Sequence, residues 1–253
     1  MNLRLIIALL LIAGCVPQEQ MPNSQLLLEE GQYEIVSSDV NYYGNSKGFF
    51  AEPKFKGNYP GIIMIHEWWG LNDNIKEMAK LLASQGYVVL AVDMYEGKVA
   101  KNQTEARQFT SSLNQTKAIE NMKAAKEYLK SKNAQKIASL GWCFGGGQSL
   151  QLALNDELDA TVIYYGRLTD DKTQLSNIRW PVLGIFGAED TGIPVASVNA
   201  FDAALDSLNV ENEIYIYPGV GHAFANPSGM NYAAEETKDA WDKTLAFLEK
   251  SLK

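Results

Sequence analysis

The sequence predicts an α/β fold in which a largely parallel sheet is covered by helices on both faces. Short apolar runs at 61–65, 87–92 and 136–140 have the length and continuity of strands that are buried on both sides. Segments with apolar residues at helical spacing separate these runs. Because parallel neighbours need such crossovers, the alternation from Gly61 onward indicates successive βαβ units.

The other elements are expected in the following order. An antiparallel pair comes first, because 32–43 and 47–53 are rich in β-branched and aromatic residues around a Gly-Asn-Ser turn. Asn72 or Asp73 caps a helix that runs to about Gln85. Residues 94–101 and 167–177 are expected to be irregular. The remaining expected helices are 104–113, 117–131, 148–155, 194–208 and 231–252, and the remaining strands are 160–165, 181–187 and 211–217.

The first fifteen residues differ in composition from the rest. Arg4 supplies a positive charge, residues 5–13 form a short apolar run, and Ile-Ala-Gly-Cys closes the segment at Cys15. The run is too short to cross a bilayer, so a signal peptide is favoured, and its end resembles a bacterial lipobox in which the cysteine is lipidated. An ordinary secretory signal with a chance cysteine is the alternative. We expect a signal peptide over 1–14, a polar tether over 15–30 and one domain over 31–253, anchored by lipid in the cell envelope.

Charge and cysteine content limit the classes of function that this chain could have. A formal net charge of −8 and a sequence pI of about 4.9, without any basic run, argue against nucleic-acid binding. The two histidines and the cysteines show no zinc-ligand spacing, so no metal or cofactor is expected. Export to an oxidising compartment would leave Cys143 without an intramolecular partner if Cys15 carries lipid, which makes Cys143 a candidate reactive thiol.

The stretch 141–147, Gly-Trp-Cys-Phe-Gly-Gly-Gly, lies between a predicted strand and a predicted helix. This pattern is typical of a nucleophile elbow, with Cys143 in place of the commoner serine. Its glycines allow a tight turn in which a Cβ would clash, and the helix N-terminus favours a thiolate. A buried structural cysteine in a glycine-rich turn is the alternative.

A cysteine nucleophile needs a base, and the base needs an orienting acid. His222 follows the last predicted strand and precedes the final helix. The chain order of α/β hydrolases is nucleophile, acid, histidine, so the acid should follow a strand between Cys143 and His222. Asp190 is the preferred candidate, with Glu189 as its competitor. All three groups would then lie at the carboxyl edge of one sheet.

The oxyanion hole would take one backbone N–H from Phe144, the residue after the nucleophile, and one from the loop after the strand 61–65, where Trp68 is the expected donor. His66 ends the same strand. We expect His66 to hydrogen-bond within the loop and so to hold the backbone of the hole.

Four motifs together resemble the dienelactone hydrolase family: His-Glu-Trp-Trp-Gly-Leu-Asn at 66–72, Gly-Trp-Cys-Phe-Gly-Gly at 141–146, Gly-Ala-Glu-Asp at 187–190 and Gly-His-Ala-Phe at 221–224. The resemblance runs from about Ser46 to the C-terminus. It implies an α/β-hydrolase fold and a triad of Cys143, Asp190 and His222. It also implies that Glu67 contacts the resting thiol, disfavours the thiolate by like-charge repulsion and helps to activate it when substrate displaces the carboxylate. Bracing of the loop is the alternative role for Glu67.

The same resemblance limits the choice of substrate. Family members that act on dienelactone hold its carboxylate with arginines, one of them shortly after the catalytic histidine, where this chain has Asn226. Asparagine lacks the charge-assisted bidentate contact, so anionic dienelactone is a doubtful substrate. Trp68, Trp69 and Tyr95 are expected to offer an aromatic rim, and Trp69, Tyr95 and Asn226 to contact the substrate.

The sequence therefore predicts a monomeric, lipid-anchored hydrolase that cleaves a small ester or lactone through an acyl-enzyme on Cys143. A ligand-binding lipoprotein that keeps the hydrolase fold without turnover is one alternative. A thiol redox protein is a weaker one, because with Cys15 lipidated no second cysteine is available to resolve a sulfenate.

Overall fold

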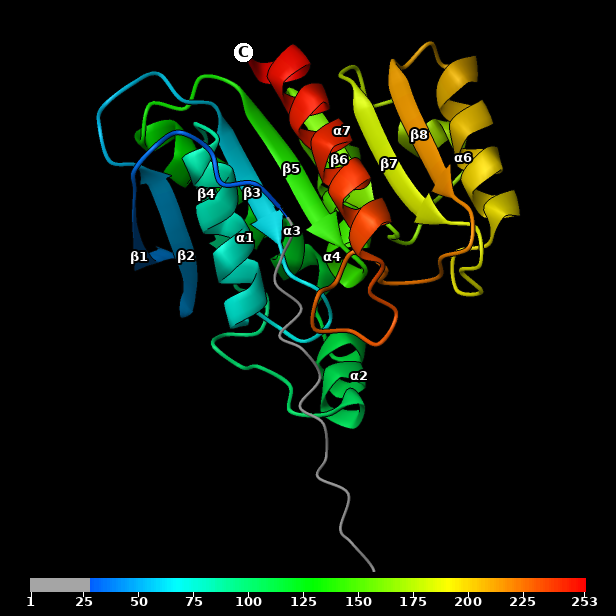
Figure 1. Cartoon of the computed structure of the whole chain (residues 1–253), viewed down its shortest axis with the longest axis horizontal. Helices are drawn as coiled ribbons and strands as arrows, with labels where there is room; N and C mark the ends of the chain where they lie inside the picture. Colours follow the sequence, from blue (N-terminus) through cyan, green and yellow to red (C-terminus); the bar gives the residue numbers. More distant parts are fainter. Residues whose placement is uncertain (1–27) are drawn as a thin grey trace, which may run out of the picture.

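The computed structural model describes residues 28–253, and within them eight strands form one sheet in the order β1-β2-β4-β3-β5-β6-β7-β8 (Figure 1). As the sequence predicted, β1 and β2 are antiparallel and the neighbours among β3 to β8 are parallel. The strand β2 also pairs antiparallel with β4. The strands are β1 (Ile35–Tyr43), β2 (Ser46–Pro53), β3 (Gly61–Ile65), β4 (Val88–Val92), β5 (Ile137–Trp142), β6 (Ala160–Tyr164), β7 (Val182–Gly187) and β8 (Asn212–Tyr217).

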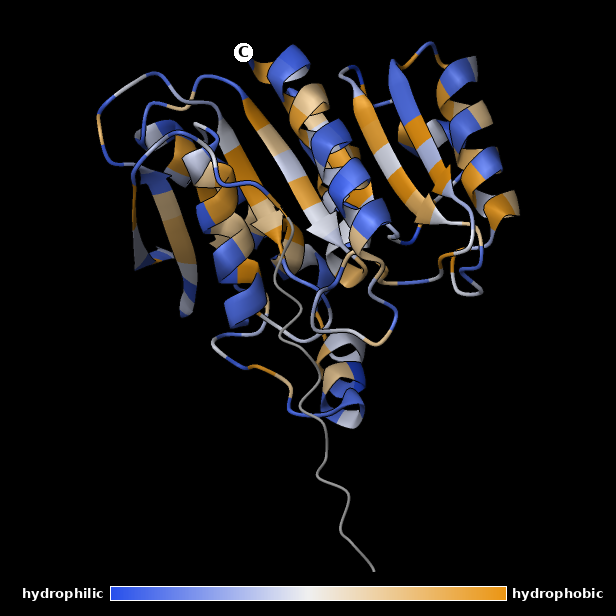
Figure 2. Cartoon of the chain, in the orientation of Figure 1, coloured by the Kyte–Doolittle hydropathy of each residue, from blue (hydrophilic) through white to orange (hydrophobic). Residues whose placement is uncertain are grey.

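Helices cover both faces of the sheet and make two apolar layers. The helices α1 and α7 contribute to one layer, and α3, α4 and α6 contribute to the other. Every residue of the central strands β3, β4, β5, β6 and β7 is buried, whereas α1 and α7 alternate between apolar and polar bands (Figure 2). The helices are α1 (Asp73–Ser84), α2 (Gln103–Ser111), α3 (Gln115–Ser131), α4 (Phe144–Asn155), α5 (Lys172–Leu175), α6 (Val195–Ser207) and α7 (Ala234–Leu252).

Asparagine side chains cap three of these helices at their N-terminal ends. The carboxamide oxygens of Asn72, Asn102 and Asn114 accept from backbone N–H groups in the first turns of α1, α2 and α3. Each cap satisfies one donor that the helix leaves without an intrahelical partner, a contribution of about 1 kcal/mol. The helix α2 lies beyond the carboxyl ends of the parallel strands, on the side to which the arrows point (Figure 1). It therefore stands next to the edge at which the site was expected.

Three predicted starts were wrong by three residues or more, and the first of them is that of β1, which begins at Ile35 instead of Gln32. The helix after the elbow begins at Phe144 instead of Gln148, so the three glycines lie inside its first turn. Helical spacing of apolar residues could not reveal this, because glycine carries no side chain to count. The last helix begins at Ala234 instead of Asn231. The segment 167–177, expected to be irregular, contains the short helix α5.

The predicted signal peptide and Cys15 lie outside the described residues. Of the predicted tether, Leu28 packs against the layer formed by α1 and α7, and the carbonyl of Glu29 accepts from Gln85 Nε2 at 3.1 Å. Within residues 28–253, no helix is both long and apolar enough to cross a membrane.

Candidate active site

Cys143 is the single residue between β5 and α4, and its backbone conformation is strained. Its φ of 55° and ψ of −116° lie in a region that residues with a Cβ seldom adopt. The turn is fixed on both sides, since Cys143 N donates to Tyr164 O at 3.0 Å and Gly147 N donates to Cys143 O at 3.1 Å. The sharp turn carries the thiol to the start of α4, as the elbow pattern predicted.

The glycines around Cys143 are required by close backbone contacts. A Cβ on Gly145 would come within 2.3 Å of Ile65 O, and a Cβ on Gly146 within 2.5 Å of Tyr164 O. A Cβ on Gly141 would meet Gly145 O at 2.2 Å. The first turn of α4 is therefore packed directly against the carboxyl ends of its neighbouring strands.

Three side chains far apart in the sequence meet at this edge. His222 Nε2 lies 3.1 Å from Cys143 Sγ, and His222 Nδ1 lies 2.7 Å from Asp190 Oδ2. The other oxygen of Asp190 accepts from the backbone N–H groups of Gly192 and Ile193 at 2.8 and 2.9 Å. Glu189, the competing acid, is exposed to solvent. The arrangement is a hydrogen-bonded chain from carboxylate to imidazole to sulfur.

Electrostatics within this chain favour a protonated imidazole. Burial alone would lower the pKa of His222, but the hydrogen bonds to Asp190 and Cys143 outweigh it and raise the pKa to about 10. Burial would raise the pKa of Asp190, yet the hydrogen bonds from His222, Ile193 and Gly192 lower it below its ordinary value. Asp190 therefore stays ionised and stabilises the charge that His222 gains when it takes a proton.

The two expected oxyanion donors belong to adjoining segments. Within residues 28–253, neither Phe144 N–H nor Trp68 N–H has a hydrogen-bond acceptor. The loop that carries Trp68 follows β3, whose final carbonyls contact the first turn of α4 through Gly145. Both groups are therefore free to donate to a bound oxygen.

His66 holds this loop, as expected from the sequence. Its ring is fully buried, and Nε2 accepts from Met94 N at 3.2 Å. Nδ1 therefore carries the proton and donates to Glu67 O at 2.5 Å. That carbonyl belongs to the same peptide group as Trp68 N–H, so His66 fixes the direction of this donor. Burial lowers the pKa of His66 to about 4, which keeps the ring neutral.

Glu67 does not make the contact with the thiol that the family resemblance implied. Its carboxylate accepts from Asn226 Nδ2, while the hydrogen-bond partner of Cys143 Sγ is His222. Burial raises the pKa of Glu67 to about 7, and the charge of His222 and the Asn226 hydrogen bond oppose this rise. In this conformation, Glu67 and Asn226 form a buried polar pair that braces the loops after β3 and β8.

A cavity of about 710 Å³ opens beside the thiol and imidazole. Three expected substrate contacts lie outside its wall. Asn226 is engaged by Glu67, Trp69 packs edge-on against Trp68, and Tyr95 packs between His66, Phe109 and Phe144. The residues that line the cavity are Thr110, Leu113, Gln115, Cys143, Phe144, Gly147, Gln148, Leu150, Gln151, Tyr165, Arg167, Leu168, Thr169, Ile193 and His222.

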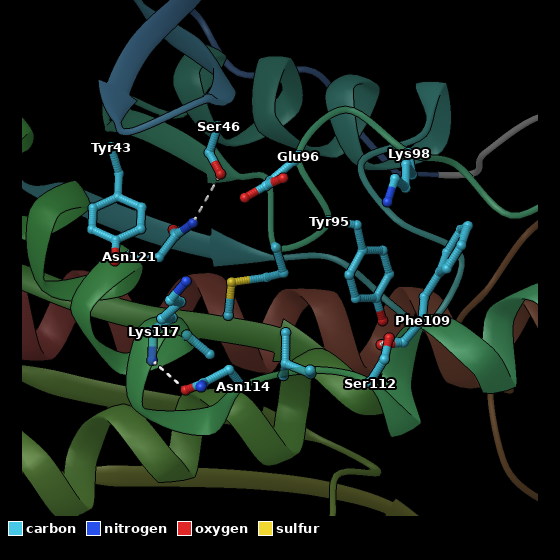
Figure 3. Close-up of a pocket in the computed structure, with 13 residues that line it drawn as sticks. Tyr43, Ser46, Tyr95, Glu96, Lys98, Phe109, Ser112, Asn114, Lys117 and Asn121 are labelled. Carbon is cyan, nitrogen blue, oxygen red and sulfur yellow. Dashed lines mark hydrogen bonds between the residues drawn. The ribbon is translucent and has the colours of Figure 1, made fainter.

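Tyr95 instead lines a second, smaller cavity of about 240 Å³ (Figure 3). This cavity lies among the loop after β4, the end of α2 and the start of α3. The expected rim position was therefore wrong for Tyr95, because its buried ring packs at tilted angles against His66, Phe109 and Phe144. In its place, the wall of the larger cavity mixes apolar side chains with amides, threonines and an arginine.

Sequence reasoning missed Arg167 and the pair Gln115–Gln148. The amides of the two glutamines donate to each other at 2.8 and 3.0 Å in the cavity wall. Arg167 follows the carboxyl end of β6, and this position was the available signal, since ligands bind at that edge of open α/β sheets. The glutamines come from two helices, and no local pattern joins them.

Comparison with known proteins agrees with this description. The family model for the dienelactone hydrolase family matches residues 46–252. A protein of Saccharolobus solfataricus with the name "Putative carboxymethylenebutenolidase" is 33% identical over 228 residues, which cover 75% of this chain and 88% of the relative. "Protein usf" of Aquifex pyrophilus is 34% identical over 220 residues, covering 81% and 94%.

Solved structures show the same fold. The structure of a Klebsiella pneumoniae protein with the name "Putative Dienelactone Hydrolase" superposes with a TM-score of 0.79 at 24% identity, covering 86% of this chain and 99% of the other. A dienelactone hydrolase-like promiscuous phosphotriesterase from metagenomic libraries gives 0.78 at 23% identity, covering 87% and 99%. These likenesses establish the architecture alone.

Fold and site together define an α/β hydrolase. The family match extends over most of the chain and confirms the resemblance that its four motifs carried. The chain belongs to the dienelactone hydrolase family, and it is a hydrolase.

Proposed function

We propose that the protein cleaves a small carboxylic ester or lactone through a covalent acyl-enzyme on Cys143, acting as a monomer. The observation that carries the proposal is the hydrogen-bonded chain Asp190–His222–Cys143 beside an open cavity. Similarity to a relative named for a lactone hydrolase supports the same reaction class.

In the first half of the reaction, His222 Nε2 holds the proton of the Cys143 thiol, as its raised pKa favours, and Cys143 Sγ attacks the carbonyl carbon. Phe144 N–H and Trp68 N–H donate to the oxyanion of the tetrahedral intermediate. The intermediate collapses with cleavage of the C–O bond, and His222 returns its proton to the leaving oxygen. Asp190 orients the imidazole and stabilises its positive charge throughout.

In the second half, a water molecule gives a proton to His222 and attacks the thioester carbonyl. The C–S bond then breaks, the acid leaves, and the proton returns to sulfur. Glu67 acts on this cycle through its charge: while its buried carboxyl group is protonated, it adds no negative charge that interacts with His222.

The test is hydrolysis of short 4-nitrophenyl esters and an enol lactone by the wild-type protein and by Cys143→Ala. We expect the variant to lose turnover by about 10⁴-fold or more with an unchanged melting temperature. Iodoacetamide should inactivate the wild-type protein with the loss of one reactive thiol. Unchanged hydrolysis by Cys143→Ala would overturn the assignment.

The same assay separates the two alternatives. A binding protein without turnover would show no iodoacetamide-sensitive hydrolysis but would be protected against melting by its ligand. A thiol redox protein would consume peroxide in the presence of an external thiol.

We also propose that the chain is exported and held at the cell envelope by a lipid on Cys15. The support is the composition of residues 1–15: one positive charge, a short apolar run and small residues before a cysteine.

A further inference from the structure

The charge of the cavity wall differs from that of the whole chain. The protein carries a formal net charge of −8, yet no aspartate or glutamate is among the described residues that line the cavity beside Cys143. Arg167 brings the one permanent positive charge of that wall. A negatively charged group in the cavity would therefore meet a cation without a competing carboxylate.

The backbone holds Arg167 close to the elbow. Gly166 packs against the first turn of α4 so tightly that an added Cβ would lie 2.3 Å from the carbonyl carbon of Gly146. A Cβ on Gly147 would meet Arg167 N at 3.3 Å and Arg167 Cβ at 3.5 Å. The backbone of Arg167 therefore packs beside Gly147, which lies one helical turn after Cys143. The Arg167 side chain is exposed to solvent.

The guanidinium group has no partner within the described part of the chain: it takes part in no ion pair and no side-chain hydrogen bond. Asp171 lies four residues away, but its two oxygens accept from Thr173 N and Gln174 Nε2 at the start of α5. The five donors of Arg167 therefore remain available to a ligand.

Neighbouring polar groups extend this part of the wall. Gln115 and Gln148 hold each other in a reciprocal amide pair, which fixes both side chains in the cavity wall. Tyr165, directly before Gly166, lines the same cavity, and its buried hydroxyl has no hydrogen-bond partner within residues 28–253. Hydrogen-bonding groups that are not satisfied by the protein itself are what a polar ligand group requires.

We propose that Arg167 determines specificity by binding a carboxylate at the far end of the acyl group, so that the preferred substrates are monoesters of dicarboxylic acids. This inference rests on the proposed function, because it concerns the substrate that Cys143 cleaves. Arg167 lies outside the four motifs that carry the family resemblance, and it follows β6 instead of the catalytic histidine.

The test compares two 4-nitrophenyl adipates, one with a free terminal carboxylate and one with a methyl ester at that end. For the wild-type protein we expect kcat/KM to be about tenfold higher for the carboxylate. Arg167→Met should remove this preference, mainly through a higher KM for the carboxylate, and leave the methyl ester within about twofold. Higher salt should weaken the preference of the wild-type protein.

Arg107→Met is the matched control, because Arg107 is exposed on α2 and does not line the cavity. It should retain the wild-type preference. The inference is overturned if the wild-type protein shows no preference, or if Arg167→Met changes both substrates equally. Hydrolysis of the methyl ester by the wild-type protein, and its loss in Cys143→Ala, tests the proposed function separately. The proposed function can therefore hold even if the inference about Arg167 fails. If the wild-type protein cleaves neither ester, both fail.

Discussion

The carboxylate of Asp190 has no solvent exposure, whereas the imidazole that it contacts is 38% exposed on the cavity side. The two side chains therefore have different roles. Three hydrogen bonds hold Asp190 in place and keep it ionised, while the open side of His222 can exchange protons with a substrate or with water. The backbone amides of Gly192 and Ile193 therefore hold Asp190, and Asp190 in turn orients His222, the base that contacts the sulfur.

Glu67 should make stability depend on pH. Its folded-state pKa is raised by burial to about 7, against 4.5 for the free group, so the native state binds the proton more tightly than the unfolded chain. The resulting stabilisation is complete below about pH 4.5 and is lost as the pH rises to about 7. Between pH 5 and pH 8, the wild-type protein should therefore lose roughly 3 kcal/mol relative to Glu67→Gln, which cannot ionise. Urea unfolding of both proteins at the two pH values measures this.

Gln can still accept from Asn226, so the substitution preserves the hydrogen bond while removing the charge. If the stability difference between the two proteins stays constant within about 1 kcal/mol from pH 5 to pH 8, burial does not control this carboxyl group.

Among the elements, β3, β4 and β5 position the two expected oxyanion donors. His66 at the end of β3 joins its loop to the loop after β4 through Met94 N, and the first turn of α4 packs on the last carbonyls of β3. The two expected oxyanion donors are thereby positioned by contacts between neighbouring strand ends. Any change that moves α4 away from β3 should separate them.

Gly145 offers a direct test of this packing. In Gly145→Ala the new methyl group would lie 2.3 Å from Ile65 O and 2.5 Å from His66 O, and neither is a flexible side chain. We expect a loss of more than about 3 kcal/mol in the free energy of unfolding, or failure to fold. Gly147→Ala is the control in the same turn, with a nearest contact of 3.3 Å. It should remain within about 1 kcal/mol of the wild-type protein, because alanine also favours the helix. Equal denaturation midpoints for both variants would contradict the close contact.

For the molecule as a whole, the parallel sheet sets the site at one edge and the helices bury both faces. The antiparallel strands β1 and β2 extend the sheet on the side away from β5, β7 and β8, the three strands that the triad residues follow in the chain. The N-terminal end of the described chain packs near α1 and α7 through Leu28. The expected triad residues Cys143, Asp190 and His222 all lie within the described residues 28–253.

Localisation can be tested on the full chain. We expect the wild-type protein to fractionate with membranes and to incorporate labelled palmitate, whereas Cys15→Ser should do neither, because a polar tether has too little apolar surface to remain in a bilayer. A chain that begins at residue 28 should be active without detergent. Labelling that persists in Cys15→Ser, or its absence from the wild-type protein, would contradict the lipid anchor.

Much of this protein could be predicted from local patterns. The buried strands, the capped helix after Asn72 and the elbow at Cys143 each leave a signal within a few residues. The meeting of Cys143, Asp190 and His222 also followed, because parallel strands place their carboxyl ends at one edge. The start of α4 was missed because three glycines hide the helical pattern, and Tyr95 was misplaced because aromatic composition does not distinguish a rim from a stack.

By itself, then, the sequence determined the order of elements, the strand ends that carry reactive groups and the family. Only the tertiary structure decided that Glu67 faces Asn226 instead of the thiol, and that Arg167 and a pair of glutamines line the cavity. The reason is physical: strand and helix patterns arise from contacts between residues close in sequence. The lining of a cavity depends on which side chains, distant in sequence, fill the space between those elements. It also depends on which polar groups are hydrogen-bonded to one another.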